Sequence, residues 1–108
     1  MSDDPANLAV YYAPTPNGWK ITICLEEIGI PYRLIPVHHG EELPEGFLKA
    51  SPNGKIPALV DSRAPSGKVV TVFESAAILL YLAEQSGQFL GDPQTDRYAV
   101  IQWLIWSG

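Results

Sequence analysis

Two stretches of this sequence carry residue types suited to holding a small anionic ligand. Glu74-Ser75 directly precedes a long apolar run, 76–83, which predicts a helix with Ser75 as its N-cap. A helix N-terminus presents unpaired N–H groups and a partial positive charge, which favour a carboxylate. Ile56-Pro57 opens a short apolar strand, although proline cannot donate to a sheet ladder. Pro57 therefore lies either on a sheet edge or where the backbone meets a ligand.

Both stretches belong to one predicted unit, residues 51–86. The strand 58–60 is followed by a turn marked by Pro65 and Gly67, and then by a second strand, 69–73. The two strands form a hairpin that leads into the helix from Ala76 to about Ser86, which Gly87 ends. The hairpin would thus begin at Ile56-Pro57 and finish at Glu74-Ser75, where it leads into the helix N-terminus.

The first third of the chain predicts a parallel strand pair. Residues 8–12 are apolar throughout, as in a strand buried on both faces, and residues 32–37 form a second strand. Between them a helix runs from about Asn17 to Ile28, with Gly29 as its C-cap. Thr15 is a suitable N-cap with Pro16 at the first helical position, although Asn17 could cap instead. A strand, a helix and a strand in this order form a βαβ unit.

Residues 47–50 leave room for a short second helix. The complete order of strands and helices is then β-α-β-α-β-β-α. It predicts an α/β fold, a four-stranded mixed sheet with helices on both faces, over residues 1–87. Residues 88–94 read as a linker, and another helix begins at Thr95 or Asp96. That helix is apolar nearly all round and needs cover on several sides. We therefore expect residues 95–108 to start a second, all-helical domain that continues beyond this sequence.

Composition narrows the classes of partner. The 108 residues carry a net charge of −5, with a pI near 4.8, which argues against nucleic acid and anionic membranes as partners. One cysteine excludes both a disulfide framework and a Cys-x-x-Cys pair. The N-terminus lacks the apolar segment of a secretory signal, and no apolar run is long enough to span a membrane. These features favour a cytoplasmic protein.

The motifs together resemble the N-terminal, thioredoxin-like domain of cytosolic glutathione transferases. The matching segments are the turn Pro14 to Trp19, Leu25-Glu26-Glu27-Ile28-Gly29, Ser51-Pro52-Asn53-Gly54-Lys55-Ile56-Pro57-Ala58, Phe73 to Leu82, and Gln102-Trp103-Leu104 with Trp106. The last of these looks like the start of the family's helical C-terminal domain. The turn Ala13 to Gly18 resembles in particular the Nu class and its fungal prion-protein relatives, which are associated with glutathione-dependent disulfide reduction as well as conjugation.

The resemblance implies a glutathione-binding role for the hairpin. It implies that the Ile56-Pro57 bond is cis and that Ile56 pairs its main chain with the cysteinyl part of glutathione, as an added strand does. Glu74 and Ser75 would receive the γ-glutamyl end, and Lys55 could meet the glycyl carboxylate. The structural alternatives are a trans proline at a sheet edge, an ordinary helix cap beside a solvated glutamate, and a surface lysine.

The chemistry implied by the resemblance is ionisation of the glutathione thiol. An unperturbed thiol has a pKa near 8.5 and is only a few per cent ionised at neutral pH. Thr15 would donate to the sulfur, with Asn17 supporting or sharing this role; the alternative is that both residues merely cap the helix. Tyr11 and Tyr12 are rival donors, because other classes use a tyrosine at the end of this strand.

We expect structural roles for the remaining reactive residues. Cys24 lies on the apolar stretch of the first helix and reads as a core residue. His38-His39 lack accompanying cysteines or aspartates and read as polar loop residues, so no metal site is expected. Glu41, Glu42 and Glu45 form a solvated run. At this loop the sequence departs from the Nu pattern, which has a longer Lys/Gly-rich segment with a glutamine ligand.

The sequence therefore predicts a Nu-like glutathione transferase, with glutathione as co-substrate and a small electrophile or a disulfide as the second substrate. Family members are usually homodimers. Two alternatives remain open at this point. One is a regulatory protein that binds glutathione without catalysis, and the other is a thioredoxin-like interaction domain that does not bind glutathione.

Overall fold

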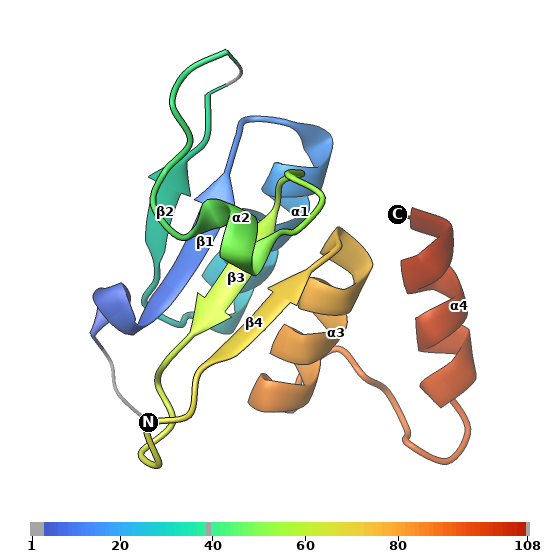
Figure 1. Ribbon diagram of the computed structural model, residues 1–108. Coiled ribbons are helices and arrows are strands. Elements are labelled where there is room, and N and C mark those ends of the chain that lie inside the picture. The colour runs from blue at the N-terminus through green and yellow to red at the C-terminus, as the bar shows by residue number, and fades with distance from the viewer. Residues whose placement is uncertain (1–3, 39, 108) are drawn as a thin grey trace.

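The computed structural model describes residues 4–38 and 40–107 (Figure 1). Its elements run in the order η1 (Pro5–Asn7), β1 (Leu8–Tyr12), α1 (Pro16–Ile28), β2 (Arg33–Pro36), α2 (Phe47–Ala50), β3 (Ala58–Asp61), β4 (Val70–Phe73), α3 (Ser75–Ser86) and α4 (Arg97–Ser107). The predicted order of strands and helices is confirmed, with bounds that differ by one or two residues. No helix in the described part of the chain is long and apolar enough to cross a membrane.

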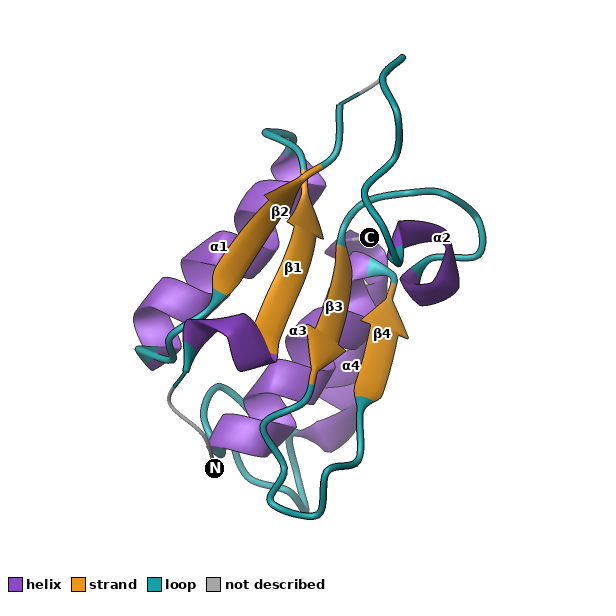
Figure 2. Cartoon of the chain, turned by 60° about the vertical axis from the view of Figure 1, so that its left-hand side comes forward, coloured by secondary structure: helices purple, strands orange, loops and turns teal. Residues whose placement is uncertain are grey.

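The four strands form one mixed sheet in the order β2-β1-β3-β4. β1 pairs with β2 in parallel, while β3 is antiparallel to both β1 and β4. The parallel pair is joined through α1 and the antiparallel pair by the hairpin turn, as the sequence predicted. Figure 2 shows the sheet nearly face-on, with α1 and α3 behind it and α2 at the opposite side.

Alternation along β1 divides the core between the two faces of the sheet. Leu8 and Val10 point to the face covered by α1 and α3, where the larger buried cluster includes Ile21, Leu25 and Leu82. On the other face a smaller cluster under α2 is made of Tyr11, Phe47, Ala50 and Ala58. Because both faces of the central strands are covered, β1 is apolar at every position.

The ends of α1 lie where the local sequence predicted them, whereas the predicted N-cap of α3 was wrong. Thr15 is the N-cap of α1 and Pro16 its first residue, and Gly29 ends that helix at a φ of 81°. Ser75, however, is not the N-cap of α3. Glu74 occupies that position, with a φ of 75° and no side-chain capping bond, and Ser75 is the first helical residue. The reason is that the chain leaves β4 through a sharp turn at Glu74, one residue earlier than the cap preference of serine suggests.

Helix α4 packs against the rest of the domain only along one side. It lies beside α3 (Figure 1), and none of its residues is buried. Trp103, Ile105 and Trp106 are each at least 60% exposed, and the two indoles meet edge to face at 5.6 Å. Such exposed apolar area is unusual for a helix in a closed domain.

Candidate functional site

A polar hollow at one end of the sheet collects most of the predicted site residues. The hollow is lined by Asn17, Ser51, Asn53, Lys55, Ile56, Pro57, Phe73, Glu74 and Ser75. These residues come from the first turn of α1, the loop between α2 and β3, and the junction of β4 with α3. Of the seven predicted site residues, only Thr15 is not in the lining, and it lies two residues before Asn17. The tertiary structure thus brings three distant segments to one place.

The junction of β4 and α3 forms one end of the hollow. Ser75 is 5% exposed at the first position of α3, where the N–H groups of the first turn have no intrahelical acceptor. Glu74 holds a left-handed φ of 75°, an unusual conformation for glutamate, and its side chain is exposed. The hollow therefore contains a helix N-terminus suited to a carboxylate and a glutamate, without a cationic partner among the described residues, that is suited to an ammonium group.

The segment before β3 supplies a backbone edge. The Ile56-Pro57 peptide bond is cis, as expected. Ile56 lies just before β3 begins at Ala58, and its N–H and C=O take part in none of the hydrogen bonds found within the described residues. An extended ligand can add to such a residue as a short strand does. Lys55 is exposed beside it, and in the described part of the chain its ammonium group has no carboxylate partner.

Ser51, which the sequence analysis did not single out, closes this loop. Its side chain is 1% exposed, and its hydroxyl donates to the Lys55 carbonyl at 2.7 Å while accepting from the Lys55 N–H at 3.2 Å. The Gly54 N–H donates to the Ser51 carbonyl at 2.9 Å. The Pro-Asn-Gly that follows Ser51 is a turn signature and could have pointed to a serine that ties the turn together. The loop in front of Ile56 is therefore held by a buried hydroxyl.

The first turn of α1 supplies polar donors. The Thr15 hydroxyl accepts a hydrogen bond from the Gly18 N–H at 3.3 Å, and its own proton has no acceptor among the described residues. Asn17 lines the hollow, and its Oδ1 accepts from the Lys20 ammonium at 3.2 Å. A side chain at Gly18 would meet the Ala13 carbonyl, since an added Cβ would lie only 2.3 Å from that oxygen. The close return of the turn onto residue 13 thus depends on glycine.

The rival tyrosines lie away from the hollow. The Tyr11 hydroxyl donates to the Glu45 carbonyl at 2.7 Å, and its ring packs on Phe47 with centroids 5.4 Å apart. Tyr12 points to the opposite face of the sheet and packs against the larger core cluster. Neither side chain lines the hollow, so the donors that remain at this end of β1 are those of the Thr15 turn.

The other reactive residues have structural surroundings. Cys24 is half-buried beside the core, and burial raises the pKa of its thiol, which makes it a poor nucleophile. His38 is exposed, and His39 lies outside the described residues. Glu41, Glu42 and Glu45 are exposed as expected. Within the described ranges no group of three or more His, Cys, Asp or Glu side chains could hold a metal ion.

A buried charge pair supports the far end of the hairpin. Arg63 donates two side-chain hydrogen bonds to the Asp61 carboxylate, each 2.9 Å long, and the Tyr81 hydroxyl donates a third at 2.7 Å. Burial by itself would raise the pKa of Asp61, but the hydrogen bonds from Arg63 and Tyr81 outweigh it and lower that pKa. Burial, followed by the bond to Asp61, raises the pKa of Tyr81 to about 12. This network ties β3 to α3 at the end of the sheet away from the hollow.

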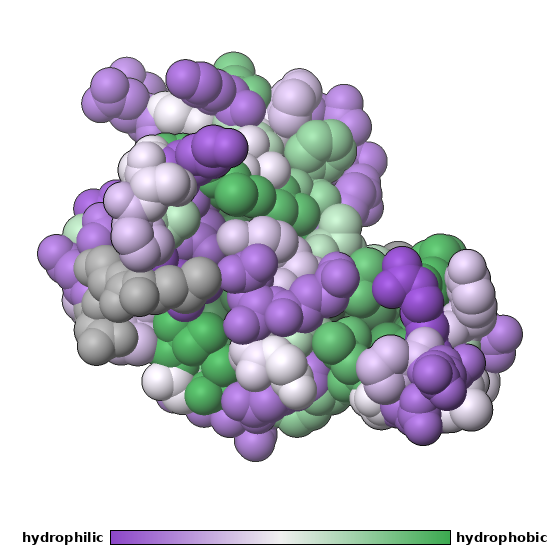
Figure 3. Space-filling view, turned by 90° about the horizontal axis from the view of Figure 1, so that it is seen from below, coloured by the Kyte–Doolittle hydropathy of each residue, from purple (hydrophilic) through white to green (hydrophobic). Residues whose placement is uncertain are grey.

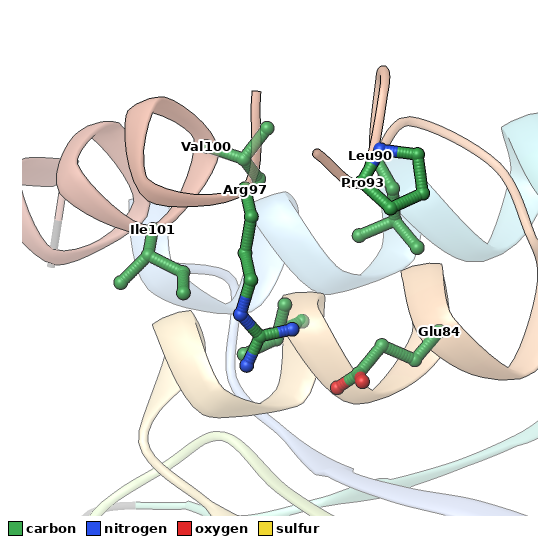
Figure 4. Close-up of a pocket in the computed structure, with 7 residues that line it drawn as sticks. Glu84, Leu90, Pro93, Arg97, Val100 and Ile101 are labelled. Carbon is green, nitrogen blue, oxygen red and sulfur yellow. The ribbon is translucent and has the colours of Figure 1, made fainter. Parts of the chain in front are cut away.

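A second hollow lies where α4 meets α3. It is lined by Leu80, Glu84, Leu90, Pro93, Arg97, Val100 and Ile101, and Figure 4 shows Arg97 reaching from α4 toward α3. Figure 3 shows hydrophobic side chains gathered at the junction between the main body and the lobe that carries α4. The lining is mostly apolar and lacks a set of converging polar groups, so we assign it to helix packing and not to chemistry.

Comparison with known proteins agrees with this geometry. Residues 15–85 match the family described as glutathione S-transferase, N-terminal domain. The disulfide-bond oxidoreductase YfcG of Escherichia coli (strain K12) is 53% identical over 101 residues, which are 91% of this chain and 47% of YfcG. The disulfide-bond oxidoreductase YghU of the same strain is 42% identical over 107 residues, covering 92% of this chain and 36% of YghU. The chain thus spans half the length of these relatives or less.

The solved structures show the same fold with ligands. A glutathione transferase family member from Pseudomonas fluorescens pf-5, with two glutathione molecules bound, superimposes with a TM-score of 0.84 at 44% identity. The match covers 97% of this chain and 47% of that one. The predicted thioredoxin-like fold is therefore confirmed. On the strength of the family match and the shared fold, this chain belongs to the glutathione S-transferase family, of which it carries the N-terminal domain.

Proposed function

We propose that this chain is the glutathione-binding part of a Nu-like, cytoplasmic and homodimeric glutathione transferase. In this proposal the enzyme ionises the glutathione thiol and uses it on a disulfide or a small electrophile. The observation that carries the proposal is the hollow in which Asn17, the Ile56 backbone and the Glu74-Ser75 helix start converge. The relatives named disulfide-bond oxidoreductases favour the disulfide as the second substrate.

The proposal assigns a partner in the hollow to each charged group of glutathione and to its backbone. The γ-glutamyl carboxylate would accept from the Ser75 hydroxyl and from N–H groups at the start of α3, while Glu74 would accept from the ammonium group. The cysteinyl residue would pair with the free N–H and C=O of Ile56. Lys55, whose ammonium is exposed at the edge of the hollow, would meet the glycyl carboxylate.

This orientation places the thiol toward the first turn of α1. A hydroxyl or amide donor to the thiolate contributes about 1–2 kcal/mol, and the helix N-terminus about 0.3–1 kcal/mol. At about 1.4 kcal/mol per pKa unit, one such donor from the Thr15–Asn17 turn, together with the helix, lowers the thiol pKa by roughly one to two units. A thiol with a pKa near 8.5 in water then becomes roughly a quarter to three quarters ionised at pH 7, and no separate base is required.

For a disulfide substrate the reaction balances without any further cofactor. The glutathione thiolate attacks one sulfur of the substrate, forms a mixed disulfide, and releases the other sulfur as a thiolate that takes up a proton. A second glutathione thiolate attacks the glutathione sulfur of the mixed disulfide, which gives glutathione disulfide and the second substrate thiol. The half-buried Cys24 thiol, with its raised pKa, takes no part in these steps.

The experiment uses full-length protein and separates three possibilities. Retention on immobilised glutathione is measured first, and the thiolate absorbance of bound glutathione is then titrated with pH. The proposal expects retention, a bound-thiol pKa one to two units below the free value, and a return toward that value in Thr15→Ala/Asn17→Ala. Retention with an unshifted pKa would indicate a glutathione-binding regulatory protein. Absence of retention would indicate an interaction domain that does not use glutathione.

A further inference from the structure

The side chain of Lys20 makes two contacts that the proposed chemistry has not used. Its ammonium group donates to Asn17 Oδ1 at 3.2 Å, one helical turn away, and to the main-chain carbonyl of Ser107 at the end of α4. Within the described ranges no carboxylate forms an ion pair with Lys20. The Lys20 ammonium is therefore shared between an amide oxygen at the site and one main-chain carbonyl of α4, which is remote in sequence.

The contact with Lys20 determines which way the Asn17 amide points. An ammonium group has three donors and no acceptor, so the atom that faces it must be the amide oxygen and not the amide nitrogen. The NH2 group of Asn17 is then directed away from Lys20. Since Asn17 lines the polar hollow, this NH2 group is available to a ligand there. Without the ammonium, the two orientations of the amide would differ little in energy.

The hydrogen bond from Lys20 also makes the NH2 group of Asn17 a stronger donor. A hydrogen bond to an ionised partner is roughly twice as strong as a neutral one, and successive hydrogen bonds polarise one another. Drawing electron density toward Oδ1 makes the N–H bonds of Asn17 better donors to a thiolate.

We propose that Lys20 is a positioning residue that turns the Asn17 amide toward the glutathione thiol. The inference deepens the proposed function and rests on it. The alternative is an ordinary pair of side chains on the surface of α1, which would add to helix stability and leave the thiol unaffected. Only a measurement on the thiol itself separates the two.

The test compares full-length wild type with Lys20→Met, Lys20→Arg, Asn17→Ala and the double variant Asn17→Ala/Lys20→Met. The pKa of glutathione bound to each is read from thiolate absorbance, and its affinity by calorimetry. If the Asn17 amide lowers the thiol pKa by about one unit and Lys20→Met removes half of that effect, the bound-thiol pKa rises by about half a unit, a threefold fall in the ionisation constant of the thiol. Lys20→Arg should restore most of the shift. Lys68→Met, which removes one exposed lysine from the distant hairpin turn, should leave the thiol pKa unchanged.

The double variant decides how Lys20 acts. If Lys20 acts through Asn17, Lys20→Met has no further effect once Asn17 is alanine. An equal rise in both backgrounds would show a direct charge effect and overturn the positioning role. A normal thiol pKa in Lys20→Met, with a raised one in Asn17→Ala, would overturn the inference and leave the proposed function standing. A normal thiol pKa in Asn17→Ala would overturn the donor role of Asn17 and, with it, the role of Lys20.

Discussion

Replacing Ser51 with alanine removes the hydroxyl that closes the loop in front of Ile56. Two hydrogen bonds are lost, the one to the Lys55 carbonyl at 2.7 Å and the one from the Lys55 N–H at 3.2 Å. Each contributes about 0.5–1.5 kcal/mol net, so the free energy of unfolding should fall by about 1–3 kcal/mol. The residue is 1% exposed, which leaves no room for water to replace the hydroxyl without rearrangement.

The loss should appear in glutathione affinity as well as in stability. When only a fraction of the molecules has the closed loop, the apparent affinity for glutathione is the intrinsic affinity multiplied by that fraction. If 1–2 kcal/mol of the closing free energy is lost, the dissociation constant rises by about fivefold to thirtyfold. The pKa of the bound thiol should not change, because its proposed donors lie on the separate turn of Thr15 and Asn17. Calorimetry of full-length Ser51→Ala, with a pH titration of the bound thiol, measures both quantities.

A matched control is available at Ser62, whose hydroxyl donates to the Asn7 carbonyl at 3.2 Å, away from the hollow. Ser62→Ala should lower the free energy of unfolding in urea and keep the affinity for glutathione. If Ser51→Ala behaves in the same way, with normal affinity and reduced stability, the reasoning that Ser51 shapes the site is refuted.

Two further predictions concern the scaffold. Arg63→Met should lower the free energy of unfolding by about 3–5 kcal/mol at pH 7, because the buried carboxylate of Asp61 loses its cation. The pKa of Asp61 is lowered in the folded wild type, so its contribution is present above the ordinary value of 3.8 and is lost as pH falls through the folded pKa. The deficit of Arg63→Met measured in urea should therefore shrink below pH 4, and a constant deficit would contradict this account. Tyr11→Phe removes the bond to the Glu45 carbonyl, so stability should fall by about 1 kcal/mol while the bound-thiol pKa stays unchanged. A raised thiol pKa in Tyr11→Phe, but not in Tyr12→Phe, would identify Tyr11 as a donor to the sulfur.

Local sequence was sufficient for the elements and several of their ends. The turn with Thr15 and Pro16, the C-cap Gly29 and the alternation along β1 each depend on neighbours within a few residues. For such features the competing conformations differ by local sterics and hydrogen bonds, which residue type alone determines. The cap of α3 was the exception. Serine favours the N-cap, but the path of the chain out of β4 places Glu74 there at a positive φ.

The sequence by itself therefore determined the order of the elements, the mixed sheet and the motifs that indicate glutathione. Only the tertiary structure brought Asn17, Ile56 and Glu74 into one hollow, turned Tyr11 away toward Glu45, and showed the hydrogen bonds of Ser51 with Lys55 and of Lys20 with Asn17. The physical reason is the range of the interactions. Helix caps and strand alternation are decided within one or two turns of chain, whereas the partner of a buried hydroxyl or an ammonium group depends on which segments the packed core brings together.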